Sequence, residues 1–223
     1  MHYSRFLVIN FLLLSLLFAN SDSTAIKLIK AVIVNQERAN LIYDAKTIIS
    51  FYSLDRKLKT QRILKSRYYV RKGRIIKGER IQTETSLKTP QDFPKYRESK
   101  ILPLFSPLSW EALPFYNFKH IGEEEKNGVM TIKIEYSPKQ KSKELSYGYV
   151  WVSKLDTDLV SLEMIASIPF TFTKYFIMKM EYVKLNNVWV PDVINVELEI
   201  NFLGIYKRYV LFKQKVIRRY FES

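Results

Sequence analysis

Cysteine is absent from this 223-residue chain, and histidine and glycine are scarce, with two and six residues. Without cysteine the chain has no disulfide, no Cys–His pair, no CxxC redox motif and no zinc site of the Cys/His type. It also lacks a cysteine that could carry a lipid anchor. A folded domain of this chain must therefore be stabilised by its core and its backbone hydrogen bonds.

The scarcity of histidine and glycine argues against two further kinds of site, a Ser-His-Asp triad and a phosphate-binding loop. His120 is the only histidine after His2. A Ser-His-Asp triad would need it, but no G-x-S-x-G motif accompanies it. The six glycines form no phosphate-binding loop. The acidic run 123–125 precedes an Asn-Gly turn, where successive carboxylates point in alternate directions toward solvent. We predict a protein that is not an enzyme, with no catalytic residue, metal site or cofactor.

The first 21 residues have the order of an export signal. Arg5 precedes 13 largely apolar residues, 6–18, and small residues follow at positions 19 and 21. A membrane-spanning helix needs roughly 20 apolar residues, so this stretch is short for a retained anchor, which is the alternative. We predict a signal peptide over residues 1–21, one domain over 22–223, and an exported periplasmic protein that is soluble or peripherally membrane-associated.

Positive charge is in excess, with 36 Lys and Arg against 22 Asp and Glu and a net charge of +14. Nucleic acid is a common partner of such basic chains, but an exported protein seldom meets it, so we predict no nucleic-acid binding. Anionic membrane lipid is the more plausible partner. A generally basic, soluble surface is the alternative interpretation.

Residues 25–39 have the pattern of a helix, because apolar side chains recur every three or four positions. Ser23 or Thr24 can cap its start. From residue 45 the period changes to two, which predicts strands. The clearest example is 192–202, where alternate residues are apolar. Asn127-Gly128 and Asn186-Asn187 predict hairpin turns, and Gly78 predicts a bulge. About ten antiparallel strands follow, with no repeat and no domain boundary.

Residues 86–118 interrupt this rhythm with five prolines, which a regular central strand does not tolerate. The segment is nevertheless apolar, so it must be buried or cover a cavity, and a short helix is expected from Ser106 or Ser109 to Leu113. We predict that residues 101–118 lie in the concavity of the sheet. If the concavity holds a ligand, this segment would act as its lid.

Aromatic residues make up 14% of the chain, more than a sheet covered on one face requires. They either fill the core, packed with the helix and the proline-rich segment, or line an apolar cavity for acyl chains. The candidate ligand-binding residues are Tyr52, Tyr68, Phe105, Trp110, Phe115, Phe118, Trp151, Phe170 and Phe172.

Three stretches in this order resemble the LolA-like outer-membrane lipoprotein-sorting superfamily. The first runs from 116–118 through 122–124 to Asn127-Gly128. The second is 148–153 with Asp156, Leu159-Val160 and Leu162-Glu163 behind it. The third runs from Tyr182 through 189–191 to 202–205. The resemblance covers essentially the whole chain after the signal segment.

This resemblance implies a mainly β (α+β) fold: a strongly curved antiparallel sheet, or unclosed β-barrel, wrapped around an N-terminal helix and a short internal helical segment. It also implies a concave side that holds lipid or lipoprotein acyl chains, as in a carrier, sorting factor or sensor of the cell envelope. The alternative is a non-catalytic structural or regulatory module that binds an envelope protein and carries no lipid.

Overall fold

The structure, a computed structural model, describes residues 22–72, 74–85, 106–169, 172–185, 188–202 and 206–221. The predicted signal peptide, Phe105, Phe170 and the Asn186-Asn187 turn lie outside these ranges. Within them, no helix is long and apolar enough to cross a membrane.

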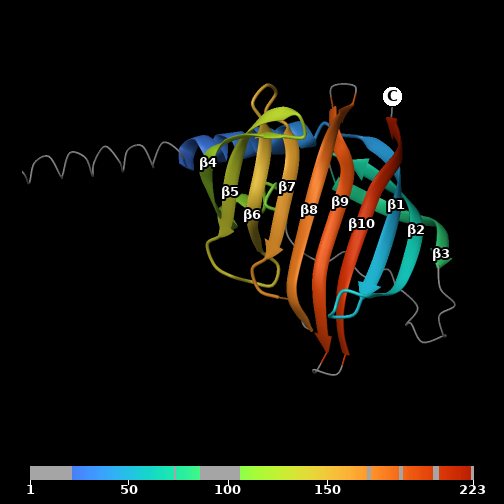
Figure 1. Cartoon of the computed structure of the whole chain (residues 1–223). Coiled ribbons are helices and arrows are strands. Elements are labelled where there is room, and N and C mark those ends of the chain that lie inside the picture. Colours follow the sequence, from blue (N-terminus) through green and yellow to red (C-terminus); the bar gives the residue numbers. More distant parts are fainter. Residues whose placement is uncertain are drawn as a thin grey trace, which may run out of the picture.

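Ten strands form one antiparallel sheet in the order β3-β2-β1-β10-β9-β8-β7-β6-β5-β4. The strands are β1 (Leu41–Tyr52), β2 (Leu58–Arg71), β3 (Arg74–Thr85), β4 (Tyr116–Lys126), β5 (Val129–Pro138), β6 (Ser146–Ser153), β7 (Leu159–Ala166), β8 (Thr173–Leu185), β9 (Val188–Phe202) and β10 (Tyr206–Phe221). The sheet is strongly curved and leaves β3 and β4 at its two edges (Figure 1). The predicted fold class is confirmed.

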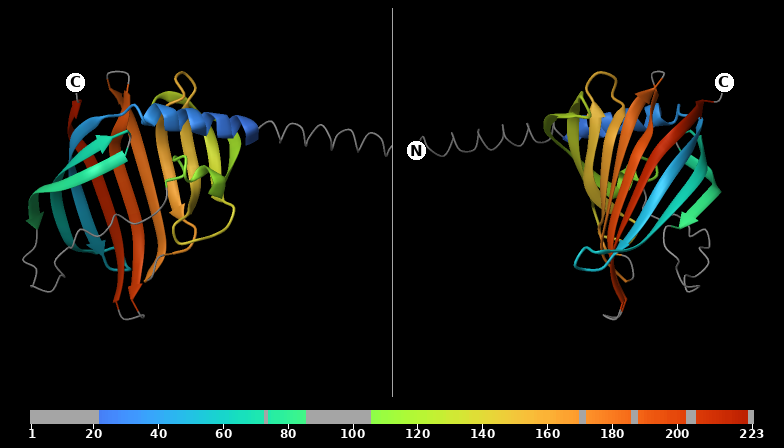
Figure 2. Two further views of the ribbon diagram at one scale, coloured as in Figure 1. Left: turned by 180° about the vertical axis from the view of Figure 1, so that it is seen from behind. Right: turned by 45° about the vertical axis from the view of Figure 1, so that its right-hand side comes forward.

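The N-terminal helix is described over residues 22–36 and crosses the concave side of β4–β7 near one end of these strands (Figure 2, left). Its fully buried side chains include Ala25, Ile29 and Val32, at the spacing that the sequence predicts. The helix ends three residues earlier than expected. Residues 37–38 form a turn, and Ala39 is buried on the way into β1.

One turn and one close contact depend on glycine or asparagine. Asn127 and Gly128 have φ angles of 53° and 75°, which confirms the predicted β4–β5 hairpin turn. Gly148 has a φ of 154°, and a Cβ there would lie 2.1 Å from the carbonyl oxygen of Glu163. Gly78 pairs with Tyr68, and the register shifts of β2 and β3 flank this pair. Gly78 itself is therefore regularly paired, and the bulges lie on either side of it, at residues 75–77 and 80–82.

The described part of the proline-rich segment, residues 106–115, packs against the helix and the sheet. Ser109 caps a short turn through its hydroxyl, 3.2 Å from the amide nitrogen of Ala112. A 3-10 helix, η1 (Leu113–Phe115), leads into β4. Leu108 and Ala112 are buried in the same cluster as the helix. This part of the segment lies in the concavity as predicted, while residues 101–105 lie outside the described ranges.

Candidate functional site

We call the face of the sheet that contacts the helix its inner face. Leu162, Met164, Met178 and Met180 belong to it, because they pack in one cluster with the helix. Cross-strand partners share a face. The β8–β9 register places Val196 opposite Met178 and Ile194 opposite Met180. The predicted apolar stripe of β9 therefore lies on the inner face.

The inner face is buried beneath the helix on β5 and β6 and also on β1, where Tyr43 and Ala45 are 1% and 0% exposed, but part of it on β8 and β9 is only partly buried. On β5 and β6 the side chains of Ile134, Val150 and Val152 are fully buried beneath the helix. On β8 and β9, Phe176 is buried opposite Leu198, but six other inner side chains are only partly buried: Met178, Met180, Ile194, Val196, Leu198 and Ile200. The half-exposed stripe is apolar, whereas the opposite face of β9 carries Glu197 and Glu199.

The predicted ligand-binding residues that lie within the described ranges do not gather in one place. Tyr68 lies on the inner face, with its ring centroid 5.1 Å from that of Tyr43, and Phe118 is buried beneath the helix. Trp110 and Phe115 belong to the segment between β3 and β4 and are 41% and 56% exposed. Phe172, 48% exposed, precedes β8.

Two of the predicted residues lie on the outer face instead. Tyr52 contacts Tyr209, whose hydroxyl donates to Glu197 at 2.8 Å. Trp151 is buried between Val150 and Val152 in sequence but points to the opposite side, where its Nε1 donates to Glu124 at 2.5 Å. The expectation that aromatic residues gather in one cavity fails for these two because neighbouring strand residues point to opposite faces.

Strands β7 and β8 are not paired along their whole length, and their hydrogen bonding stops before the end that carries the β6–β7 turn. The β7–β8 ladder joins residues 161–165 to residues 177–181. Strand β8 then continues through Tyr182 to Leu185, paired with β9. The β6–β7 turn and the β8–β9 hairpin therefore stand apart at this end, close to the end of the helix (Figure 1).

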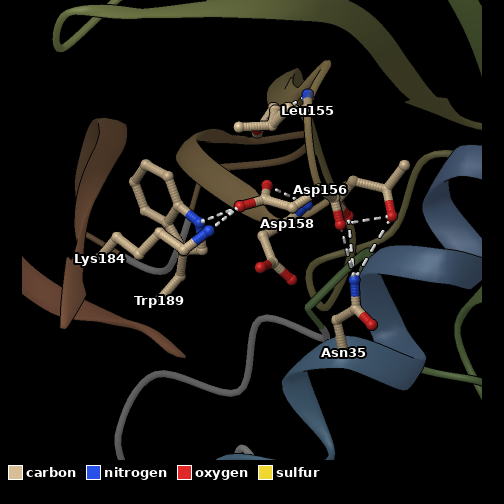
Figure 3. A network of polar contacts seen from close by, with 8 residues as sticks. Asn35, Leu155, Asp156, Asp158, Lys184 and Trp189 are labelled. Carbon is tan, nitrogen blue, oxygen red and sulfur yellow. Dashed lines mark hydrogen bonds and ion pairs between the residues drawn. The ribbon is translucent and has the colours of Figure 1, made fainter. Parts of the chain in front are cut away.

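Asp156 in the β6–β7 turn bridges this separation (Figure 3). Its carboxylate forms an ion pair with Lys184 and accepts a hydrogen bond from Trp189 Nε1 at 3.3 Å. Its backbone carbonyl accepts a hydrogen bond from Asn35 Nδ2 of the helix at 3.2 Å. One turn thus joins the helix to β8 and β9. Leu155, 90% exposed, points away from this network.

The two carboxyl groups of the turn differ in their electrostatics. Burial acts to raise the pKa of Asp156, but hydrogen bonds from Lys184, Ser153 and Trp189 outweigh it and lower the pKa to about 2. Burial and the neighbouring Asp156 carboxylate raise the pKa of Asp158 above its ordinary value. The surroundings therefore stabilise the charged form of Asp156 and disfavour the charged form of Asp158.

Two hollows flank the bridge. A cleft of about 230 Å³ on the helix side is lined by Asn35, Gln36, Arg38, Asp156, Asp158, Leu159, Tyr182, Lys184 and Trp189. We call it the rim cleft. A second hollow, of about 540 Å³, lies between the β4–β5 turn, the β6–β7 turn and the β8–β9 hairpin. No group of His, Cys, Asp or Glu within the described ranges could hold a metal ion.

Sequence reasoning did not identify the rim cleft. Its members come from four places in the chain: the helix end, the β6–β7 turn, and the facing ends of β8 and β9. Only the β8–β9 register, which pairs Lys184 with Trp189, brings the last two together. One feature of the sequence could have indicated the cleft: Asp156 lies in the turn that follows the strand containing Trp151.

Three solved structures are similar to this chain over most of its length. A protein domain from Vibrio parahaemolyticus assigned to outer membrane lipoprotein sorting is 10% identical, with a TM-score of 0.48 over 91% of this chain and 94% of that one. A LolA superfamily protein from Nitrosomonas europaea is 8% identical, with a TM-score of 0.39 over 89% and 94%. The MucA/MucB complex of Pseudomonas aeruginosa gives 7% identity and a TM-score of 0.32 over 90% and 99%.

The first two of these proteins are named for outer membrane lipoprotein sorting and for the LolA superfamily. The curated proteins contain no match. A model of a family of unknown function, DUF5686, matches residues 35–214, which span the end of the helix and the sheet from β1 into β10. The chain belongs to this family.

Proposed function

We propose that this protein binds acyl chains of a lipid or lipoprotein on the half-exposed inner face of β8 and β9, without catalysis, as a periplasmic carrier, sorting factor or sensor. The observation that carries the proposal is the apolar stripe from Met178 and Met180 to Ile194 and Val196. The helix buries the equivalent face of β5 and β6 but leaves this stripe partly open to solvent.

The energetics favour an apolar ligand over a polar one. Each methylene that such a stripe removes from water contributes about 0.8 kcal/mol. The inner side chains of β8 include two methionines, whose flexible thioethers adapt to ligands of different shape. Polar groups of β9 and β10 gather on the other face, where Tyr209 donates to Glu197. Binding would therefore be driven by apolar burial.

The test uses purified protein, native mass spectrometry and titration with palmitate and with a phospholipid. The double variant Met178→Gln/Met180→Gln places amides on the inner stripe with little change in volume. Lys179→Gln changes the residue between them, whose ammonium contacts Glu163 at 3.0 Å on the outer face, and serves as the matched control. We expect the double variant to weaken binding at least about tenfold, the equivalent of about 1.4 kcal/mol, and the control to bind normally.

Two results would refute the proposal. If no lipid co-purifies and none binds, acyl binding is wrong; if the double variant binds as tightly as the parent protein, the site on the inner stripe is wrong. Circular dichroism and thermal unfolding of both variants show whether a loss of binding reflects a loss of fold.

A protein partner is the second candidate, and the edge strand β3 favours it. Ile75, Ile76 and Ile81 on this strand are 45%, 59% and 54% exposed, a high apolar exposure for a sheet edge. Edge strands can pair with an extended segment of another protein. Replacing Ile76 and Ile81 by lysine would abolish such binding and leave lipid binding unchanged, which separates the two candidates.

A further inference from the structure

The rim cleft lies beside the apolar stripe on the same side of the sheet. Tyr182 lines the cleft and also packs against the cluster beneath the helix. Met180, two residues before it on β8, belongs to the stripe. Residues two apart on a strand lie roughly 7 Å apart on one face. A polar hollow and an apolar surface therefore adjoin within the length of one lipid molecule.

The rim cleft is lined by four charged side chains, of which only two form an ion pair with each other. Asp156 is paired with Lys184. Arg38 and Asp158 also line the cleft, but neither forms an ion pair within 4.0 Å among the described residues. The Asp158 carboxylate has a hydrogen bond from Asn35, and Lys184 and Arg38 act on it at longer range. An opposed pair separated by a cleft of about 230 Å³ leaves room for a dipolar group between its members.

Resting on the proposed function, we propose that the rim cleft binds the headgroup of a zwitterionic aminophospholipid whose acyl chains lie on the inner stripe. The ammonium group would contact Asp158, and the phosphate would contact Arg38, with Lys184 nearby. Arginine suits phosphate because its planar guanidinium can donate two parallel hydrogen bonds. The aromatic rings of Tyr182 and Trp189 form the remaining walls.

A comparison of two probes separates headgroup recognition from acyl-chain binding. One probe is phosphatidylethanolamine with a pyrene-decanoyl chain, and the other is diacylglycerol with the same chains. Pyrene fluorescence is titrated with the full protein and with Arg38→Met and Asp158→Asn. We expect each variant to bind the phosphatidylethanolamine about tenfold more weakly and the diacylglycerol within about twofold of the parent. Arg38→Lys should restore part of the loss.

The controls keep the outcomes distinct. Lys77→Met removes an exposed cation on β3, which pairs with Glu79 away from the cleft, and should change neither affinity. Met178→Gln/Met180→Gln should weaken both probes. If Arg38→Met and Asp158→Asn leave phosphatidylethanolamine binding unchanged, or weaken both probes equally, the headgroup site is wrong while acyl binding stands. If the parent protein binds neither probe, the proposed function fails and this inference fails with it.

Discussion

Similar aliphatic residues on the inner face differ in burial between β5–β6 and β9. On β5 and β6, Ile134 and Val150 are 0% exposed because the helix lies across them. On β9, Ile194 and Val196 occupy the same face but remain partly exposed. Aliphatic composition alone therefore does not distinguish a buried strand from a partly exposed one. The helix covers the first pair of residues and leaves the second pair partly exposed.

We call β4–β7, which lie beneath the helix, the closed side of the sheet, and β8 and β9 its open side. The border between the two sides coincides with the separation of β7 and β8. The turn that bridges it holds the helix through Asn35 and holds β8 and β9 through Lys184 and Trp189. The turn therefore anchors the closed side to the open side at the place where the β7–β8 ladder ends. Substitutions on each side, and in the bridge, test whether this division is energetic as well as geometric.

The largest effect is expected on the closed side, from Gly148→Ala. The new Cβ would lie 2.1 Å from the Glu163 carbonyl oxygen, and the φ of 154° suits glycine. Clash and backbone strain together should lower the free energy of unfolding by about 4 kcal/mol. Gly122→Ala is the matched control, because Gly122 has a φ of 157° but no atom within 4 Å of the new Cβ. Urea denaturation measures both, and equal losses would show that the contact with Glu163 is unimportant.

A matched isoleucine pair sharpens the comparison directly. Ile134→Ala removes a fully buried side chain beneath the helix and should cost about 3 kcal/mol. Ile194→Ala removes a half-buried side chain from the stripe and should cost about 1 kcal/mol, because less apolar surface is lost from the core. Chemical denaturation gives both values. A loss at Ile194 as large as that at Ile134 would mean that the open side is core.

The bridge between the two sides should depend on pH. The folded pKa of Asp156, about 2, lies below its unfolded value of 3.8. Its contribution is therefore complete above pH of about 4 and is lost as the pH falls toward about 2, with a magnitude of up to about 2 kcal/mol. Asp158, whose pKa is raised, acts in the opposite sense. Asp156→Asn should lower stability at neutral pH and flatten its dependence below pH of about 4.

Asp55→Asn is the control for this pH effect. Asp55 pairs with Lys57 at 3.1 Å, but its side chain is 55% exposed. Hydrogen bonds from Ser53 and Lys57 lower the pKa of Asp55, but solvent screens such exposed contacts, so the substitution should change the pH profile of unfolding less than Asp156→Asn does. Identical profiles for Asp156→Asn and the parent protein would show that the ion pair with Lys184 does not stabilise the bridge.

The period of the sequence was enough to predict the strands and the helix. The alternation within 192–202 places Ile194, Val196, Leu198 and Ile200 on the inner face, and the steps from Ala25 to Ile33 place the helix on the sheet. Local patterns carry this information because strand and helix geometry repeat over a few residues. The β1–β10 pairing, between strands at opposite ends of the chain, has no such local signal.

The candidate site was less predictable, for a related reason. The predicted binding residues share only their aromatic character, whereas the face to which each side chain points depends on whether its position in the strand is odd or even. Trp151 follows Val150 by one residue and therefore faces away from it. The rim cleft depends on where the β7–β8 ladder ends, which is a tertiary property. Charged residues in turns gave only a weak indication of it.

The smallest effect is expected at Trp110, where the helix, the proline-rich segment and solvent meet. Its Nε1 donates to Glu37 at 3.1 Å, and the side chain is 41% exposed. An exposed hydrogen bond of this kind contributes about 1 kcal/mol or less. Trp110→Phe should therefore lower the free energy of unfolding by less than about 1 kcal/mol, well below the roughly 3–5 kcal/mol typical of a core aromatic residue.

The same substitution tests whether the segment around Trp110 acts as a lid over the stripe. Trp151 and Trp189 hydrogen-bond to Glu124 and Asp156, so replacing them to isolate the fluorescence of Trp110 would disturb the fold. Labelling with 5-fluorotryptophan avoids this, and Trp110→Phe assigns the Trp110 resonance in ¹⁹F NMR. A lid predicts that a long-chain fatty acid shifts this resonance saturably and that Trp110→Phe changes the affinity. An unmoved resonance during saturable binding would show that the segment is a fixed wall, because the ligand then enters without displacing it.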